Sequence, residues 1–191
     1  MPEITSIDPL EALEVIGAAR YGMEAASQLQ HALQCAHLAE ISGASDALIA
    51  ACLLHDIGHL VGDDRHEAPR EDHAIVGARY LAQWFDPAVT EPVRLHAEAK
   101  RCLVVVDALY FGTLSTASKR SLRSQGGAMT QAEAQSFGNL PYARDAIALR
   151  RWDDRAKDPH ATVPPLAHYR ALLDDLLRLR NARGLAMTPS D

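Results

Sequence analysis

The sequence predicts an all-α fold, on three observations. Apolar residues recur at helical spacing in one segment after another, and Gly, Pro, Ser and Asp separate those segments. The one run with strand propensity, Leu103–Val106, is flanked by helical pattern and has no partner run elsewhere, so we interpret it as buried helix. With 191 residues and 48% hydrophobic content, we expect one bundle-like domain over residues 1–191, with its core in residues 21–180.

Caps and turn residues set the ends of the first three expected helices. Gly17 weakens the end of the first pattern, Ser42-Gly43 is a C-cap for the second, and Ser45 and Asp46 offer N-caps for the third. The helices predicted from these signals span residues 9–19, 23–41 and 47–55. Residues 62–72, which contain His66, are polar and broken by a proline, so we expect a surface loop there.

Similar signals order the second half of the chain. Asp86-Pro87 ends one helical pattern, and Thr130 followed by Glu133 has the spacing of a capping box. Residues 159–165 form a linker, and we expect residues after Asn181 to be frayed. The helices predicted here span residues 73–84, 89–106, part of 110–122, 129–137, 141–154 and 166–180, which gives roughly nine in all.

Composition limits the class of protein. The net charge of −6 argues against a non-specific nucleic-acid binder and leaves room for a pocket that takes a small anion. Three widely spaced cysteines in apolar contexts indicate reduced, buried thiols. The N-terminus lacks the features of a signal peptide, and no apolar run is long enough to span a membrane. We therefore expect a cytoplasmic protein with a small-molecule substrate, without nucleic-acid or membrane partners.

The segment Leu53–His59 combines an apolar run with polar side chains that need a partner. A neutral imidazole of His55 and the carboxylate of Asp56 can face one cation, and this mixed nitrogen and oxygen set suits Fe, Mn or Zn. The alternative is a helix C-terminus with His55 at the negative end of the helix dipole and Gly58 as C-cap.

Further potential ligands favour the metal. Each histidine near an apolar residue is, taken alone, more often a hydrogen-bonded structural residue, but several buried imidazoles in one helical domain leave polar atoms that a metal satisfies together. With Asp56 and either Asp153 or Asp154, the ligand count suits two metals that share a bridging carboxylate. The histidines in question are His31, His55, His73 and His96.

These residues resemble the H…HD…H…H…D pattern of the HD-domain superfamily in its dinuclear form. The adjoining segments are similar to those of the organophosphonate-degrading HD-domain oxygenases, which are mixed-valent diiron enzymes related to myo-inositol oxygenase. The resemblance extends over residues 21–169 and implies an HD-domain helical bundle. The segments that carry it are Tyr21 and Glu24, 28–36, 54–59, 96–101, 114–118, 121–127 and 149–157.

The resemblance implies two iron ions, Fe(II) and Fe(III), bridged by Asp56. It assigns His31, His55, Asp56 and Asp153 to one ion, and Asp56, His73 and His96 to the other. Asp153 is preferred to Asp154 because it follows Arg-Arg-Trp and precedes Lys157 by four; the alternative for Asp154 is a solvated acid. His66 competes with His73, but its loop context is less suited to a ligand.

Basic residues near the ligands predict an anion site. Lys100 lies one helical turn after His96, and Arg150 lies three residues before Asp153, so each shares a face with a ligand. They are interpreted as a clamp for a phosphonate, with carboxylate pairing as the alternative for each. The resemblance adds His59, Ser118 and Gln125 to this site. It also implies that Tyr21 and Glu24 act in gating and in holding the amino end of the substrate; the alternative is an ordinary surface pair.

The function implied is a dioxygenase that cleaves a carbon–phosphorus bond. The expected substrates are O2 and 2-amino-1-hydroxyethylphosphonate or its N-trimethylated analogue, with phosphate and glycine or glycine betaine as products. The alternative is a metal-dependent HD-type phosphohydrolase that acts on a nucleotide or phosphate ester. A third hypothesis is a non-catalytic helical sensor. The sequence does not determine the oligomeric state or choose between amine and trimethylammonium.

Overall fold

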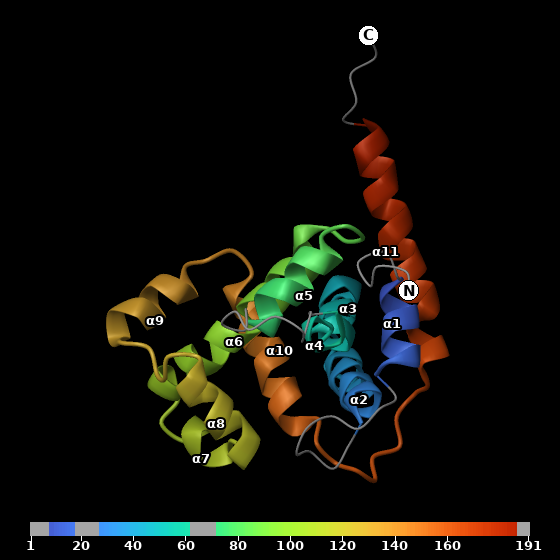
Figure 1. Cartoon of the computed structure of the whole chain (residues 1–191). Helices are drawn as coiled ribbons and strands as arrows, with labels where there is room; N and C mark the ends of the chain where they lie inside the picture. The colour runs from blue at the N-terminus through green and yellow to red at the C-terminus, as the bar shows by residue number, and fades with distance from the viewer. Residues whose placement is uncertain (1–7, 18–26, 62–71, 187–191) are drawn as a thin grey trace.

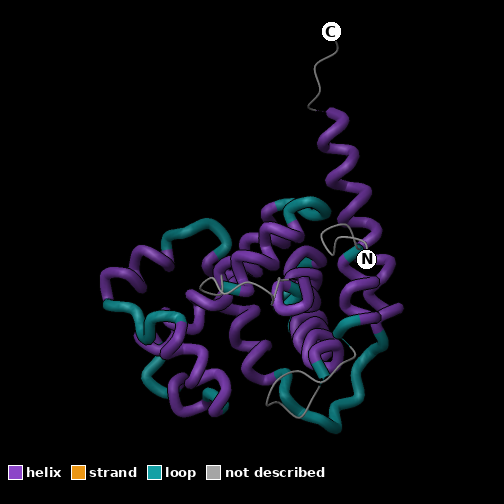
Figure 2. The backbone as a smooth tube through the Cα atoms, in the orientation of Figure 1, coloured by secondary structure: helices purple, strands orange, loops and turns teal. Residues whose placement is uncertain are grey.

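The computed structural model describes residues 8–17, 27–61 and 72–186, and the all-α prediction is confirmed within them. These ranges contain eleven helices and no strand (Figure 2). The helices are α1 (Pro9–Val15), α2 (Gln28–Ile41), α3 (Asp46–Leu54), α4 (Gly58–Val61), α5 (His73–Leu81), α6 (Pro87–Val106), α7 (Tyr110–Thr113), α8 (Thr116–Ser124), α9 (Gln131–Gly138), α10 (Ala143–Arg155) and α11 (Leu166–Ala186).

The long helix α6 lies at the centre of the packing. It contacts α3, α5, α7, α9 and α10, while α2 packs on α3 and α10. In Figure 1, α7, α8 and α9 gather on one side of the molecule, and α1 and α11 lie on the opposite side. The largest apolar core joins α1, α2, α3, α5, the start of α6 and parts of α10 and α11, and two smaller clusters lie between α6, α10 and the α7–α9 region.

The sequence of α3 explains its central position. Every residue from Leu48 to Leu54 is buried, so this helix has no polar face and must be covered on all sides. Asp46 occupies its first turn, and the Ser45 hydroxyl accepts a hydrogen bond from the Leu48 amide at 3.3 Å, as the capping prediction required. The helix ends at His55, and it therefore delivers that side chain into the interior.

Several helix ends differ from the predictions. Helix α1 ends at Val15, and α2 begins at Gln28 because the Ser27 hydroxyl caps it in extended backbone. Residues 110–122, where we expected one short helix and a loop, contain α7 and most of α8, since the Ser115 hydroxyl caps a second helix. The expectation that residues after Asn181 fray is wrong for residues 182–186, because α11 continues to Ala186; for residues 187–191 it lies outside the described residues. No helix in the described ranges combines the length and apolar composition needed to cross a membrane.

Gly58 has a different role from the one expected. It begins α4 directly after the central motif, and the lack of a side chain lets α4 approach α5. A Cβ atom at Gly58 would lie 2.0 Å from the His73 carbonyl oxygen and 2.8 Å from the Gly77 amide nitrogen. Gly58 therefore sets the position of the first turn of α5, which carries His73.

Replacing Gly58→Ala should destabilise the fold, because the added methyl group meets backbone that cannot turn aside. We expect a loss of about 2–3 kcal/mol in the free energy of unfolding, measured by urea denaturation. The matched control is Gly112→Ala in α7, where a Cβ meets nothing within 4 Å. The control should be neutral or stabilising by up to about 1 kcal/mol. Equal unfolding midpoints for the two variants would contradict the close approach.

Candidate metal centre

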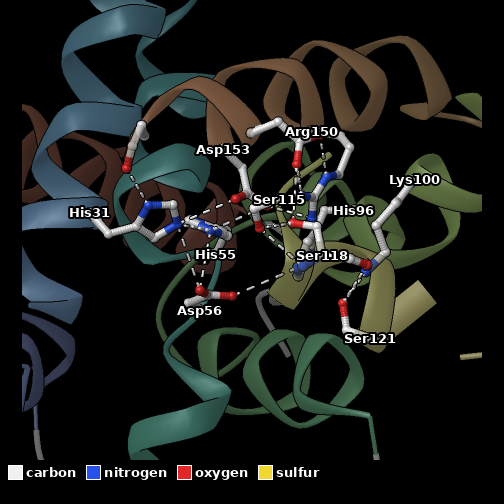
Figure 3. A network of polar contacts seen from close by, with 12 residues as sticks. His31, His55, Asp56, His96, Lys100, Ser115, Ser118, Ser121, Arg150 and Asp153 are labelled. Carbon is white, nitrogen blue, oxygen red and sulfur yellow. Dashed lines mark hydrogen bonds and ion pairs between the residues drawn. The ribbon is translucent and has the colours of Figure 1, made fainter. Parts of the chain in front are cut away.

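Six polar side chains meet in the interior where α2, α3, α5, α6 and α10 converge. His55 is fully buried and His96 is 1% exposed. Figure 3 shows His31 of α2, His55 and Asp56 at the end of α3, and Asp153 of α10 pointing toward one another. These six are the residues predicted from the sequence as ligands: His31, His55, Asp56, His73, His96 and Asp153.

The first group is formed by His31, His55 and Asp153. The Nε2 atoms of the two rings are 3.3 Å apart, and the Oδ1 atom of Asp153 lies 3.4 Å from the Nε2 atom of His31. The other oxygen of Asp153 lies 3.8 Å from the Nε2 atom of His55. One oxygen of Asp56, Oδ2, approaches the same two rings at 3.8 Å and 3.5 Å.

The second group faces the other oxygen of Asp56. The Nε2 atoms of His73 and His96 are 3.1 Å apart, and Asp56 Oδ1 lies 3.4 Å from the first and 3.8 Å from the second. The two oxygens of the Asp56 carboxylate therefore face two different pairs of imidazoles. This is the arrangement of a carboxylate that bridges two ions.

The opposite nitrogen of each ring is held by an acceptor. The Nδ1 atoms of His31, His55 and His96 donate to the carbonyl oxygens of Ala156, Cys52 and Val93 at 2.7, 2.8 and 2.7 Å. His73 Nδ1 faces an oxygen of Asp72 at 3.2 Å. A proton on Nδ1 leaves the Nε2 lone pair of a neutral ring directed into the cluster, as in ring orientation at metal sites.

Electrostatics prepares two of the rings for a cation. Burial lowers the pKa of His55 and lowers that of His96 well below its ordinary value, so both rings are neutral near pH 7. Burial also opposes a charge on His31, but the hydrogen bond to Asp153 and the negative charges of Asp153 and Asp56 together outweigh it and raise the pKa of His31 to about 9. Without an ion, a proton therefore occupies the space between His31 and Asp153, and metal binding must displace it.

The donor set fits divalent metal ions. Two ligand atoms at about 2.1 Å from one ion lie about 3.0 Å apart at a right angle and about 3.4 Å apart in a tetrahedron. The separations of 3.1–3.8 Å within each group are close to these values. Four imidazoles and two carboxylates suit Fe, Mn or Zn, and the low polarity of the surroundings would strengthen the attraction.

Arg150 pairs with carboxylates, the alternative that the sequence left open. Its Nη1 atom lies 2.6 Å from Asp153 Oδ2, and its Nε atom donates to Asp154 Oδ2 at 3.0 Å. The interpretation of Asp154 as a solvated acid is wrong, because its side chain is only 8% exposed. It is covered by Arg150 and by Tyr110.

Lys100 has no carboxylate partner among the described residues. Its side chain is almost fully buried, and its ammonium donates one hydrogen bond, to the Ser121 hydroxyl at 2.7 Å. Burial and the nearby Arg150 guanidinium lower the pKa of Lys100 to about 8. A buried cation with donors to spare can bind an anion, and Figure 3 shows Lys100 on the same side of the cluster as Ser118 and Ser121.

Ser118 lies in the first turn of α8, where its amide donates to Ser115 at 3.1 Å. The ammonium of Lys157 donates to the hydroxyl of Ser118 at 3.1 Å, which adds a second lysine beside the cluster. In the sequence, Lys157 served only as a spacing marker for Asp153. Its position four residues after Asp153 was the signal that could have indicated a role.

Of the remaining predicted site residues, His59 lies beside the cluster, Gln125 lines a cavity, and three lie outside the described residues. The ring of His59 stacks on His73 with centroids 4.0 Å apart, and ligand atoms of Asp56, His59 and His73 lie within 4.8 Å of one another. Gln125 contacts Asp72 at 3.5 Å and lines a cavity of about 130 Å³ that is bordered by Arg94, Glu98 and Arg101. The expectations for Tyr21, Glu24 and His66 lie outside the described residues.

Comparison with known proteins identifies the family. A model described as "HD domain" matches residues 28–125, a segment that contains every predicted ligand except Asp153. The chain therefore belongs to the HD-domain family. This agrees with the helical architecture and with a histidine and aspartate cluster built around the His55-Asp56 pair.

Relatives narrow the identification to phosphonate-degrading oxygenases. The chain is 48% identical over 159 residues to hydroxymethylphosphonate dioxygenase of Gimesia maris. This alignment covers 81% of this chain and 79% of the relative. It is 30% identical over 187 residues to [1-hydroxy-2-(trimethylamino)ethyl]phosphonate dioxygenase (glycine-betaine-forming) of Leisingera caerulea, covering 92% and 95%. An uncharacterized protein of Acanthamoeba polyphaga mimivirus is 32% identical over 170 residues, covering 86% and 78%. The predicted membership among HD-domain phosphonate oxygenases is confirmed.

Metal ions should stabilise this protein, because they bind only when the six donors are assembled. Adding Fe(II) anaerobically to metal-free protein at about 100 times the dissociation constant should raise the melting temperature by about 5–10 °C. His31→Ala should reduce this increase, whereas His37→Ala, on the same helix but outside the cluster, should not. Differential scanning calorimetry measures the effect. A melting temperature that Fe(II) leaves unchanged would contradict a metal centre at this cluster.

Proposed function

We propose that the protein is an iron-dependent enzyme that uses O2 to cleave the carbon–phosphorus bond of a 1-hydroxyalkylphosphonate. The observation that carries this proposal is the carboxylate of Asp56, whose two oxygens face two separate imidazole pairs within 3.4–3.8 Å. The buried ammonium of Lys100 beside this cluster supplies charge for a phosphonate. Membership among the phosphonate oxygenases of the HD-domain family supports the same chemistry.

The donor set divides between two metal sites. His31, His55 and Asp153 would hold one iron and His73 and His96 the other, with Asp56 shared. When bound, the iron pair supplies the activation of O2 and the redox chemistry that protein side chains lack. The helices contribute orientation, since each ring is fixed through its Nδ1 atom before any ligand arrives. The apolar helices around the cluster exclude water from a site where reactive oxygen species are handled.

The anion of the substrate has its own set of donors. Lys100 acts as a point charge for the phosphonate, and Arg150 retains N–H groups beyond those that it gives to Asp153 and Asp154. The hydroxyl of Ser118 lies at the start of α8, where the helix dipole favours negative charge. We assign these groups to positioning and neutralising the phosphonate while the neighbouring carbon reacts.

The substrate is proposed at the level of its reacting group. The Gimesia relative is named for hydroxymethylphosphonate and the Leisingera relative for a trimethylammonium compound, and both carry a hydroxyl on the carbon bonded to phosphorus. With one O2, hydroxymethylphosphonate would yield formate and phosphate, and 2-amino-1-hydroxyethylphosphonate or its trimethylated analogue would yield glycine or glycine betaine and phosphate. As the family resemblance implies, we assign Glu24 to the end of the substrate that differs between these compounds and Tyr21 to gating.

Oxygen consumption and phosphate release test this function directly. Protein reconstituted anaerobically with iron is offered each of the three hydroxyphosphonates, and we expect one O2 consumed per phosphate released with at least one of them. Methylphosphonate, which lacks the hydroxyl, should be inert. The rival function, a metal-dependent phosphohydrolase, predicts phosphate from a phosphomonoester without oxygen uptake. That result would refute the proposal, and loaded protein inert toward all these compounds would favour the sensor hypothesis.

Lys100 should control affinity for the phosphonate. Lys100→Met should lower kcat/KM by about 10- to 100-fold, because it removes a charged hydrogen-bond donor from a buried site. Lys119→Met, on the surface near Phe111, is the matched control and should retain the original value. Steady-state oxygen uptake measures both.

The pH dependence gives a second readout of the same group. Because the pKa of Lys100 is about 8, its positive charge is complete below that pH and is lost above it. We therefore expect kcat/KM to fall by about tenfold per pH unit above pH 8. Arginine stays charged at these pH values, so in Lys100→Arg the fall in kcat/KM should begin at a higher pH. A profile that is identical in the two proteins would contradict the role of Lys100.

A further inference from the structure

The carboxylate of Asp154 is buried without belonging to the metal cluster. Its side chain is 8% exposed, and its two oxygens accept from Arg150 on one edge and from the Tyr110 hydroxyl at 2.5 Å. The Ser118 hydroxyl adds a longer contact at 3.5 Å. Burial and the Asp154 carboxylate raise the pKa of Tyr110, so the phenol keeps the proton that it donates. A buried acid with this many donors is fixed in one orientation.

Asp154 determines how Arg150 meets Asp153. Guanidinium groups prefer to grip a carboxylate with two parallel hydrogen bonds. Here the two nitrogens on one edge of the Arg150 guanidinium, Nε and Nη2, donate to Asp154. Only Nη1 is left for Asp153. Arg150 therefore contacts the Oδ2 atom of Asp153 at 2.6 Å, while the Oδ1 atom faces His31 at 3.4 Å.

We propose that Asp154, supported by Tyr110, is a positioning residue that keeps one oxygen of Asp153 available to the metal. Without the charge of Asp154, the fork of Arg150 would be free to turn onto both oxygens of Asp153, its other buried anionic neighbour. The guanidinium would then compete with the ion for the same ligand. This inference rests on the proposed function, because it takes Asp153 as a ligand of the first ion.

The inference explains two adjacent aspartates with different roles. Both side chains are 8% exposed and both touch Arg150, so burial and charge do not distinguish them. Their positions on α10 do: Asp153 is turned toward α2 and α3, and Asp154 toward Tyr110 in α7. One carboxylate faces the cluster and the other holds the arginine that would otherwise cover it.

Anaerobic calorimetric titration with Fe(II) tests the proposal. The unaltered, metal-free protein should bind two ions, and Asp154→Asn should weaken binding of one of them by about 10- to 100-fold. Tyr110→Phe keeps the carboxylate and should weaken the same ion less; it serves as the test if Asp154→Asn does not fold. The matched control is Asp107→Asn, which removes the exposed partner of Arg151 on the same helix. This control should bind both ions as the unaltered protein does.

A double-mutant cycle separates positioning from a general structural effect. If Asp154 acts through Arg150, then Asp154→Asn should have little further effect on Fe(II) affinity in an Arg150→Gln background. An equal loss of Fe(II) affinity in both backgrounds, or unchanged binding in Asp154→Asn, would overturn the inference about Asp154. The proposed function would still stand if the unaltered protein binds two ions. Failure of the unaltered protein to bind Fe(II) overturns both.

Discussion

The structure depends on the burial of a cluster of nitrogen and oxygen donors in an all-helical core. Five helices must converge for the six side chains to meet, and His55 reaches the cluster only because α3 is apolar on every side. Burying so many polar atoms costs free energy unless they share partners. Backbone carbonyls satisfy one nitrogen of three rings, and the cluster itself must satisfy the other. The same convergence of helices therefore completes the core and brings the buried donor atoms together.

Much of this arrangement could be predicted from the sequence. Helical periodicity predicted the helices, and the resemblance to the HD-domain pattern predicted the set of side chains that the fold brings together. The relation between His96 and Lys100 also followed from spacing alone, since residues four apart share a helix face. Ser45 and Thr130 act as N-caps as expected, because caps depend on local backbone geometry.

What could not be predicted depends on contacts between distant segments. Asp154 was interpreted as solvated because nothing in its neighbourhood in sequence indicates that Tyr110, 44 residues away, covers it. Gly58 was considered as a helix C-cap, whereas its importance comes from the backbone of α5 packed against it. Lys157 and Ser118 meet only because the end of α10 passes the start of α8. Periodicity reports which face of a helix is buried, and it does not report the partner.

The hydrogen bonds that hold the imidazole rings differ in whether they join one helix to itself or two helices to each other. This difference decides how well each ring keeps its orientation when the helices shift. His55 and His96 are each tied to a carbonyl three residues earlier in or beside their own helix, so small rigid shifts of these helices preserve the tilt of the rings. His31 is tied to Ala156, across the interface between α2 and the end of α10. Its aim therefore depends on how two separate helices are aligned. Loosening of that interface would misdirect this one imidazole while leaving the others in register.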